Sequence, residues 1–357
     1  MGDKKKVLLG MSGGVDSSVA AILLKEQGYE VIGCTMELCK NSSCCNIETY
    51  TEAKKICKAL GFEHFIYNLS EDFQKHVIDD FVSEYKICHT PNPCIECNKY
   101  LKFGLMWEKA KSLGCDYIAT GHYAKSVFDK KYNKYVLKKS ENEKKDQSYV
   151  LYTIPKDLIR HLLLPLGEYK SKDEVRQKAL DYGFGVASKK DSEDICFIPD
   201  GNYKAFLEKL NFKAQKGNII LKDGTILGQH KGLYRYTIGQ RKGLGISYKE
   251  PLFVVAFNAL KNELIVGTEK DLYSNEFMVK DVNLLLVDSL DTALKCEVKI
   301  RYSAKTVPCT IQKIDNNLVK VVVDSPIKSV TPGQSAVFYV DDIVVRGRKN
   351  RLIIEKR

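Results

Sequence analysis

The residues with the clearest capacity for chemistry lie between an apolar run and a helical pattern, and they are Gly10, Met11, Ser12, Gly13, Gly14, Val15, Asp16 and Ser17. Glycines allow a backbone to approach an anion closely, and amide groups at the start of a helix stabilise phosphate. The serines add hydroxyl donors, and the Asp16 carboxylate is the kind of ligand that Mg²⁺ prefers. The segment lacks the lysine of a Walker A loop and the glycine spacing of a dinucleotide fingerprint. It therefore predicts a phosphate-binding loop of a different type.

Cysteines supply a second candidate site. Cys94 and Cys97 lie in the segment PNPCIECN ahead of a helical pattern, and Cys196 lies far downstream in the segment DSEDICFI. A thiol at a helix N-terminus has a lowered pKa, which makes it a competent nucleophile or metal ligand. A structural zinc site would need a second pair of cysteines at ribbon or finger spacing, and the sequence has none. The arrangement favours reactive sulfur chemistry.

The positive charge lies almost wholly in the C-terminal part. Residues 1–200 hold 30 Lys+Arg against 29 Asp+Glu, whereas residues 201–357 hold 26 against 16, so that +1 and +10 make up the net charge of +11. Such an excess predicts contact with a polyanion in the C-terminal part. Tyr234 and Tyr236, which lie among basic residues, could stack on bases or simply belong to a solvated strand face.

The composition bounds the class of protein. The chain has 357 residues, 44% apolar and 28% charged, which is typical of a soluble protein of about two or three domains. Its apolar runs are far shorter than the roughly 18 residues that a membrane span needs. The N-terminus reaches glycines before any signal-peptide core develops. We therefore expect a cytoplasmic protein without a membrane partner, in which the 12 cysteines are reduced.

Alternating strand and helix patterns must position the loop and the first two cysteines. The strand patterns begin near residues 7, 30, 64 and 116, and helices are expected over residues 17–27, 47–60, 77–85, 98–113 and 172–182. This alternation predicts a parallel sheet covered on both faces. A hairpin is expected over residues 123–137, and a short helix over residues 203–210. Glycine-punctuated strands then run to about residue 267, and apolar alternations after residue 273 have the spacing of a small antiparallel barrel.

A set of motifs resembles one family closely. SGGVDSS, NPCIECN with LKFG, TGHYA, KDQSYVLY, LPLGEYKSKDEVR, DSEDICFI, GLYRYTIGQRKGLGI, RYSAK and VTPGQSAVFY occur in the order found in the bacterial tRNA-specific 2-thiouridylases, which belong to the ATP pyrophosphatase superfamily. The resemblance implies an α/β parallel-sheet ATP pyrophosphatase domain, like adenine nucleotide α-hydrolases, over residues 1–200. It further implies a central tRNA-binding β-rich domain over residues 201–272 and a C-terminal antiparallel β-barrel over residues 273–357.

The resemblance also implies roles for individual residues. ATP would be held by the loop from Gly10 to Ser17 together with Met36 and Gly121, and Mg²⁺ by Asp16. Cys97 would be the nucleophile, and Cys196 would carry persulfide sulfur. The residues that correspond to tRNA contacts, at the target base or in the anticodon arm, are Asn92, Pro93, Cys94, His122, Lys145, Asp146, Gln147, Arg301, Tyr302 and Gln334.

The reaction that the resemblance implies is the ATP-dependent 2-thiolation of the wobble uridine in tRNA, carried out by a tRNA-uridine 2-sulfurtransferase. It would need a sulfur-donating protein and a reductant. Two routes for the sulfur stay open, because Cys94, Cys97 and Cys196 could instead hold a [4Fe–4S] cluster that presents sulfide. Another ATP-dependent ligase would explain the loop but not the three cysteines, and a non-catalytic RNA-binding protein would explain the charge but not the loop.

Overall fold

A parallel sheet forms the centre of the N-terminal domain in the computed structural model, which describes residues 4–39, 47–188, 195–280, 283–287, 289–315 and 318–349. Its strands are β1 (Lys6–Gly10), β2 (Glu30–Glu37), β3 (Glu63–Asn68), β4 (Tyr117–Ala119) and β7 (Leu162–Leu163), in the order β3-β2-β1-β4-β7. All neighbouring pairs are parallel. The predicted α/β fold is confirmed, although the two-residue strand β7 was not foreseen.

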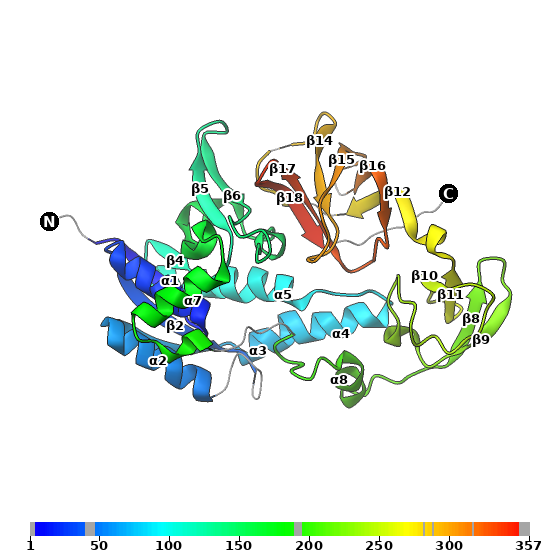
Figure 1. The fold of residues 1–357 in the computed structure, drawn as a ribbon, viewed down its shortest axis with the longest axis horizontal. Coiled ribbons are helices and arrows are strands. Elements are labelled where there is room, and N and C mark those ends of the chain that lie inside the picture. Colours follow the sequence, from blue (N-terminus) through cyan, green and yellow to red (C-terminus); the bar gives the residue numbers. More distant parts are fainter. Residues whose placement is uncertain are drawn as a thin grey trace.

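Helices cover both faces of this sheet (Figure 1). Successive residues of a strand point to opposite faces. Accordingly Val7 and Leu9 of β1 pack with α1 (Val15–Glu26) and α2 (Ile47–Leu60), whereas Leu8 packs with α6 (Met106–Ser112). All three strand residues are fully buried. This two-sided burial fixes β1, and with it the start of the loop that follows.

Two long helical stretches extend from the domain toward the rest of the molecule (Figure 1), and both contain a π-helical segment. The first consists of α3 (Ser70–Phe73), η1 (Gln74–Ile78) and α4 (Asp79–Lys86). The second consists of α5 (Pro93–Glu96), η2 (Cys97–Leu105) and α6. Both begin earlier than the sequence pattern indicated. In the second stretch Pro93 is the first helical residue, a position that proline favours.

The remaining helical elements are short or peripheral. They are η3 (Ser148–Val150), η4 (Lys156–His161), η5 (Pro165–Glu168), α7 (Lys172–Asp181), η6 (Gly185–Ser188), α8 (Tyr203–Lys209), η7 (Leu233–Arg235) and η8 (Glu269–Leu272). Among the described residues, no helix is long and apolar enough to cross a membrane.

The central part of the chain forms a small sheet of its own. Its strands are β8 (Gly217–Leu221), β9 (Ile226–His230), β10 (Phe253–Asn258) and β11 (Glu263–Gly267), in the order β10-β11-β8-β9. Ile219, Val254, Leu264 and Val266 have no exposed surface and centre its core.

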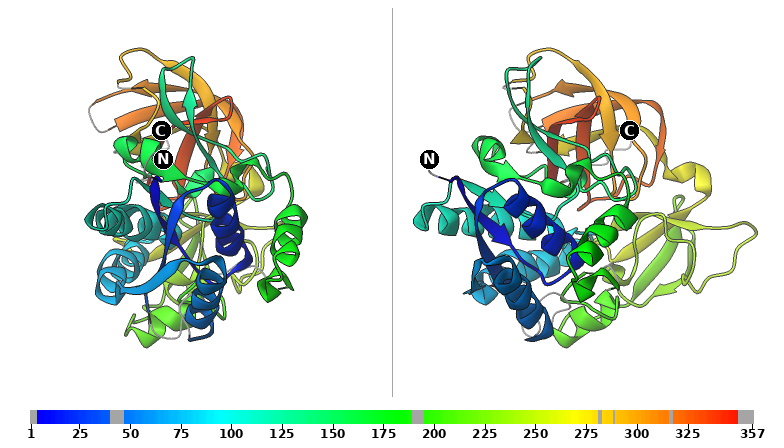
Figure 2. Two further views of the ribbon diagram at one scale, coloured as in Figure 1. Left: turned by 90° about the vertical axis from the view of Figure 1, so that its left-hand side faces the viewer. Right: turned by 60° about the vertical axis from the view of Figure 1, so that its left-hand side comes forward.

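The C-terminal strands form the predicted antiparallel barrel domain. They are β12 (Tyr273–Lys280), β13 (Asn283–Leu284), β14 (Leu294–Lys299), β15 (Val307–Lys313), β16 (Leu318–Lys328), β17 (Ser335–Val340) and β18 (Ile343–Lys349). The hairpin β5 (Lys125–Asp129) and β6 (Lys134–Lys138) of the N-terminal domain continues this sheet, since Ile343 pairs with Lys138. Figure 2 shows the hairpin rising beside the barrel. The two domains therefore share one sheet, which the sequence pattern did not indicate.

Candidate functional site

The loop after β1 is shaped by its own serines and glycines. The Ser12 amide donates to Ser17 Oγ over 3.2 Å, and the Ser18 hydroxyl donates to the Gly14 carbonyl over 2.8 Å. Gly13 adopts φ +65°, and a Cβ there would lie 2.5 Å from the Thr49 carbonyl oxygen of α2. Gly14 precedes α1 without a side-chain cap, so the first amides of α1 stay available to an anion. This local geometry fits the phosphate loop that the sequence predicts.

The strands beside β1 place the other predicted nucleotide residues around this loop. Met36 lies near the end of β2 and Gly121 follows β4, and these strands flank β1 on either side. A Cβ at Gly121 would lie 2.8 Å from the backbone carbon of Asp16 and 2.9 Å from the Ser17 nitrogen. Only glycine allows this backbone to pass so close to the start of α1.

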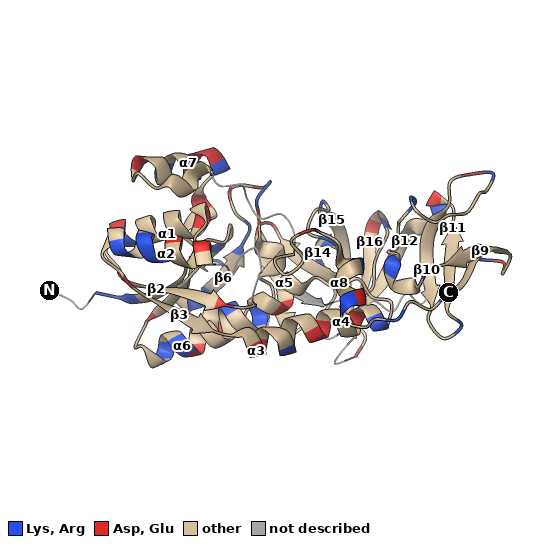
Figure 3. Cartoon of the chain, turned by 90° about the horizontal axis from the view of Figure 1, so that it is seen from below, with Lys and Arg blue, Asp and Glu red and all other residues tan. Residues whose placement is uncertain are grey.

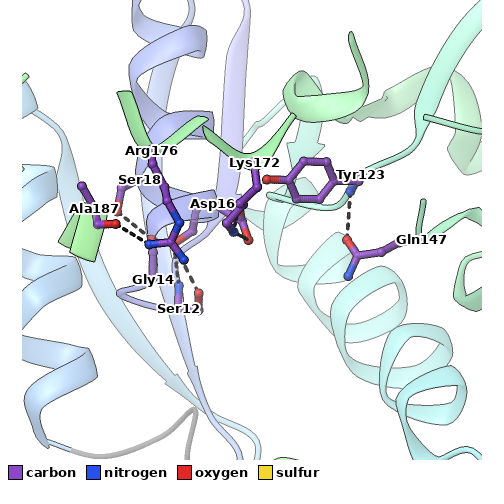
Figure 4. Close-up of polar contacts among 10 residues, drawn as sticks. Ser12, Gly14, Asp16, Ser18, Tyr123, Gln147, Lys172, Arg176 and Ala187 are labelled. Atoms are coloured by element: carbon purple, nitrogen blue, oxygen red, sulfur yellow. Dashed lines mark hydrogen bonds and ion pairs between the residues drawn. The ribbon is translucent and has the colours of Figure 1, made fainter. Parts of the chain in front are cut away.

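Asp16 lies in a polar cluster that the sequence did not reveal (Figure 4). Lys172 Nζ lies 2.7 Å from both carboxylate oxygens of Asp16, and the Tyr123 hydroxyl donates to Oδ1 over 2.7 Å. The backbone N–H of Tyr123 donates to the side-chain Oε1 of Gln147 over 2.9 Å, and the backbone N–H of Gln147 donates to the backbone carbonyl of Tyr123 over 2.7 Å. Tyr123 therefore connects the loop carboxylate with Gln147, one of the predicted tRNA contacts.

The motif segments TGHYA and KSKDEVR were the only available sequence signals for Tyr123 and Lys172. Helix or strand periodicity could not predict their contact with Asp16, because Tyr123 and Lys172 are 107 and 156 residues away from it in the sequence.

The first two cysteines occupy different environments. Asn92 caps α5, since its Oδ1 accepts from the Cys94 amide over 3.2 Å, so Cys94 lies in the first helical turn and is exposed. Cys97 lies one turn later and is buried, with 7% of its surface exposed. The expectation of a lowered thiol pKa at the helix start is wrong for Cys94, because crowding by protein atoms raises its pKa despite its exposed surface. Pro93 is buried beneath this turn.

Cys97 and Cys196 share one apolar cluster as reduced thiols. The residue after Cys196 anchors the segment, because the Phe197 ring packs edge-on against Phe73 at 5.6 Å and Phe81 at 5.5 Å between centroids. The Ile198 amide donates to the Ile195 carbonyl over 2.8 Å and closes a turn around Cys196. Residues 191–194 of the DSEDICFI segment lie outside the described residues.

The three cysteines are not arranged as a metal site. Within the residues that the structure describes, no three His, Cys, Asp or Glu side chains lie together so that they could hold a metal ion. Cys94 is exposed and does not belong to the cluster of Cys97 and Cys196. Among the described residues the three cysteines therefore do not form a ready ligand set for a [4Fe–4S] cluster, and the cluster route stays an untested alternative to the persulfide route.

Three of the predicted tRNA contacts in the N-terminal domain are buried, namely Pro93, His122 and Asp146. Asp146 Oδ1 accepts from the Ser140 and Ser148 amides, and its Oδ2 accepts from the Ser148 hydroxyl over 2.7 Å. His122 bonds Thr120 Oγ1 through Nδ1 over 2.7 Å, and burial lowers its pKa well below the usual value. Burial therefore favours the neutral form of His122. Lys145 and Gln147, on either side of Asp146, are partly exposed.

The predicted contacts from the barrel lie at its junctions with other domains. Gln334 Nε2 donates to the Thr90 carbonyl over 2.7 Å, which joins the barrel to the chain just before Asn92. An Arg301 amino group donates to the carbonyls of Ile238 and Ser329 at 3.3 and 3.0 Å, while the Arg301 Nε is buried without a hydrogen-bond partner. Tyr302 is 41% exposed and packs against the Tyr149 ring at 6.2 Å.

The central domain contributes a basic hollow. Its volume is about 260 Å³, and it is lined by Lys204, Lys231, Arg235, Tyr236, Gln240, Lys242 and Gly243. Tyr234 and Tyr236 are only 4% and 7% exposed, so both predicted alternatives, base stacking and a solvated strand face, are wrong. The hollow instead presents four basic side chains, those of Lys204, Lys231, Arg235 and Lys242. Along the helices of the N-terminal domain, by contrast, basic and acidic residues are mixed (Figure 3).

Comparison with known proteins gives matches over nearly the whole chain. Family profiles described as the tRNA methyl transferase HUP domain, the tRNA methyl transferase PRC-barrel domain and the aminomethyltransferase beta-barrel domain match residues 5–200, 204–268 and 274–347. The protein named tRNA-specific 2-thiouridylase MnmA from Clostridioides difficile (strain 630) is 45% identical, covering 99% of this chain and 98% of its own length. The protein of the same name from Clostridium botulinum (strain Alaska E43 / Type E3) is 46% identical, with coverage of 96% and 97%.

A solved structure shows a more remote likeness. The U34-tRNA thiolase NcsA from Methanococcus maripaludis with its [4Fe-4S] cluster is 21% identical, with a TM-score of 0.36, over 59% of this chain and 68% of that one.

Proposed function

This chain belongs to the tRNA-specific 2-thiouridylase family, and on that premise we propose that it replaces the C2 oxygen of the wobble uridine in tRNA with sulfur, in a reaction driven by ATP. The observation that carries the proposal is the packing of Cys97 and Cys196 in one apolar cluster. A phosphate loop alone would suit many ATP-dependent ligases. Two reduced thiols that come from distant parts of the chain and belong to one apolar cluster suit a sulfur transfer.

ATP activates the base, because the carbonyl oxygen at C2 is a poor leaving group. That oxygen attacks the α-phosphate, which breaks the bond to the β-phosphate and leaves an adenylated base and pyrophosphate. The amides at the start of α1 and the hydroxyls of Ser12 and Ser17 would stabilise the phosphate charge. Met36 and Gly121 would border the adenosine, since Met36 lies near the end of β2, Gly121 follows β4, and these two strands flank β1.

Asp16 fits a Mg²⁺ ion that is bound mainly through the nucleotide. Mg²⁺ commonly takes one or two carboxylates, with phosphate oxygens and waters completing its octahedron. Asp16 offers one partly exposed carboxylate beside the loop, with 35% of its side chain exposed. When bound, Mg²⁺ would neutralise charge on the departing pyrophosphate.

Sulfur enters from a persulfide on Cys196. Its terminal sulfur attacks C2 and displaces AMP, which carries the original uridine oxygen. The Cys97 thiolate then attacks the sulfur bonded to Cys196 Cβ, which releases the thiolated base and leaves a disulfide between Cys97 and Cys196. A two-electron reductant restores both thiols, and a sulfur-donating protein reloads Cys196. Equally, Cys97 could attack first and liberate hydrosulfide, which then attacks C2 with the same overall balance.

The tRNA would lie against the C-terminal part and the junctions between domains. The basic hollow of Lys204, Lys231, Arg235 and Lys242 suits the phosphate backbone, because cations in a concave surface attract polyanions. Tyr302 supplies an exposed ring for a base, and Lys145 and Gln147 supply polar contacts nearer the loop. By the family resemblance, Asn92, Pro93 and Cys94 would form the contact with the target base, in which the partly exposed Asn92 and the exposed Cys94 supply accessible surface and the buried Pro93 begins the helix that holds them.

Incubating the persulfide-loaded protein with ATP, Mg²⁺ and unmodified tRNA, followed by analysis of the digested nucleosides, tests the function. The proposal expects ATP-dependent 2-thiouridine. ATP-dependent formation of another product would favour a different ligase. Binding of tRNA with no ATP consumption would favour an RNA-binding protein without catalysis.

A further inference from the structure

The ammonium group of Lys172 forms an ion pair with the Asp16 carboxylate, the group that a nucleotide-bound Mg²⁺ would need as a ligand. Lys172 Nζ lies 2.7 Å from Oδ1 and 2.7 Å from Oδ2 of Asp16, so that it engages both oxygens (Figure 4). The side chain of Lys172 is only 13% exposed. A cation held this way competes directly with Mg²⁺, because both require the same carboxylate lone pairs and repel each other.

Lys172 is not required to hold its helix in place. Helix α7 packs on α1 through an apolar cluster in which Val175 and Ala179 of α7 meet Val15 and Val19 of α1. Ser171 caps α7, since its Oγ accepts from the Glu174 amide over 3.2 Å. A second ion pair, between Lys178 and Glu26 at 2.7 Å, links the same two helices farther along. The position of the Lys172 backbone is thus fixed by other contacts.

The side chain of Lys172 can still move. Lysine carries a point charge on a flexible stem of four carbons, whereas the planar arginine fork holds one orientation. Because Lys172 is the first residue of α7, its stem extends from the rigid helix toward the phosphate loop. Phosphate oxygens in that loop would lie beside Asp16 and would offer the ammonium stronger negative charge than one carboxylate does.

We propose that Lys172 is a phosphate ligand of the bound nucleotide, and that its ammonium leaves Asp16 for the phosphate oxygens when Mg–ATP binds. The inference rests on the proposed ATP site. In the nucleotide-free protein the ammonium neutralises the loop carboxylate. In the complex it neutralises phosphate, and Asp16 becomes available to Mg²⁺. One lysine therefore serves two acceptors in turn, and the Tyr123 hydroxyl can keep its hydrogen bond to Asp16 throughout.

The test measures binding rather than turnover. The full-length protein is titrated calorimetrically with the Mg²⁺ complex of α,β-methylene-ATP, which resists cleavage between the α- and β-phosphates. Lys172→Met is expected to weaken binding by about tenfold or more, the usual effect of losing one charge-assisted hydrogen bond. Lys178→Met is the matched control, because it removes an ion pair of equal length between the same two helices. It is expected to change the affinity by less than about twofold, as for a surface ion pair.

Mn²⁺ alone, followed by its paramagnetic resonance, gives a second readout on the nucleotide-free protein. Lys172→Met is expected to tighten Mn²⁺ binding severalfold, because the variant frees the Asp16 carboxylate. Adding Asp16→Asn to that variant should abolish the gain. Unchanged Mn²⁺ affinity in Lys172→Met would mean that the ammonium does not occupy the carboxylate in solution, and would overturn the proposal.

Two further variants guard against a folding defect. Lys172→Gln keeps a polar stem, and Lys172→Arg keeps the charge. Arginine is expected to bind the analogue more tightly than glutamine, and equal affinities would contradict a charge-based role. If the unmodified protein itself fails to bind the analogue, the ATP site is refuted. If that protein binds and Lys172→Met binds equally well, only the role of Lys172 is refuted.

Discussion

The phosphate loop and the thiol site differ in how they are built. The loop lies between two consecutive elements, β1 and α1, and hydrogen bonds among Ser12, Gly14 and Ser17 shape it locally. The thiol site instead combines Cys97, in the second turn of a helical stretch, with Cys196, which Phe197 anchors from far downstream. A local site is ready as soon as its elements form. A composite site depends on packing between remote segments.

This difference in construction predicts that mutations in the two regions impair different steps of the reaction. Changes in the loop act on charge and backbone approach, so they should impair nucleotide use while leaving RNA binding intact. Changes at the thiols should stop sulfur transfer while leaving nucleotide binding intact. Each prediction below tests whether the two regions act independently in this way.

The largest effect is expected at the thiols. After treatment with the same persulfide donor, Cys97→Ala and Cys196→Ala should each form 2-thiouridine only at background level, because Cys196→Ala cannot carry the persulfide and Cys97→Ala cannot release the thiolated base. The measurement is mass spectrometry of digested tRNA after a single turnover. Both variants should bind α,β-methylene-ATP like the unmodified protein. Loss of analogue binding in either variant would show that the two regions are not independent.

The second-largest effect is expected at the Asp16 carboxylate of the phosphate loop. Asp16→Ala should slow thiolation by about 10²- to 10³-fold, the scale for removing one preorganised electrostatic contact. Its affinity for tRNA, measured by fluorescence anisotropy, should stay within about threefold, because the excess positive charge lies beyond residue 200. Comparable thiolation rates in the variant and the unmodified protein would refute the ATP assignment.

The basic hollow should affect RNA binding alone. Lys231→Glu with Lys242→Glu should weaken tRNA binding by about tenfold and lower the salt slope by about 0.7 to 0.9 per lost phosphate contact. The control is Lys213→Glu with Lys261→Glu, which reverses two charges on exposed lysines of the same domain outside the hollow. An equal loss in this control would mean that net charge, rather than the hollow, governs binding.

The smallest effect is expected at Cys94. Because Cys97 and Cys196 belong to one apolar cluster whereas Cys94 is exposed with a raised pKa, Cys94→Ala should lower thiolation by less than about tenfold. Iron and acid-labile sulfide are measured in the same anaerobic preparations. Complete inactivity of Cys94→Ala, in a preparation whose unmodified form holds about four irons, would contradict the persulfide route.

Local sequence patterns predicted much of the fold. Strict apolar patterning predicted strands β1 to β4, helix α2 and the barrel strands, because burial on one or two faces leaves a periodic trace in the sequence. Strand β7 has two residues and leaves no such trace. The shared sheet depends on a single pair, Ile343 with Lys138, between segments that are remote in sequence.

The functional site likewise has parts that the sequence predicted and parts that it did not. Motif resemblance predicted the loop and the cysteines, yet the bonds of Lys172 and Tyr123 to Asp16 form only when distant elements meet. The sequence also suggested free aromatic rings at Tyr234 and Tyr236, whereas the fold buries both. Phe212 packs against the Tyr234 ring at 4.8 Å, a contact that composition alone does not reveal.

The central claim is that ATP activates the C2 oxygen of the uridine as an adenylate. The most direct measurement uses tRNA that carries ¹⁸O at C2 of the wobble uridine, with ATP, Mg²⁺ and the persulfide-loaded protein. Mass spectrometry then follows the label. The account predicts one ¹⁸O in AMP for each 2-thiouridine formed, with none in pyrophosphate. Label released into water, or ATP cleaved to ADP and phosphate while 2-thiouridine forms, would contradict the account.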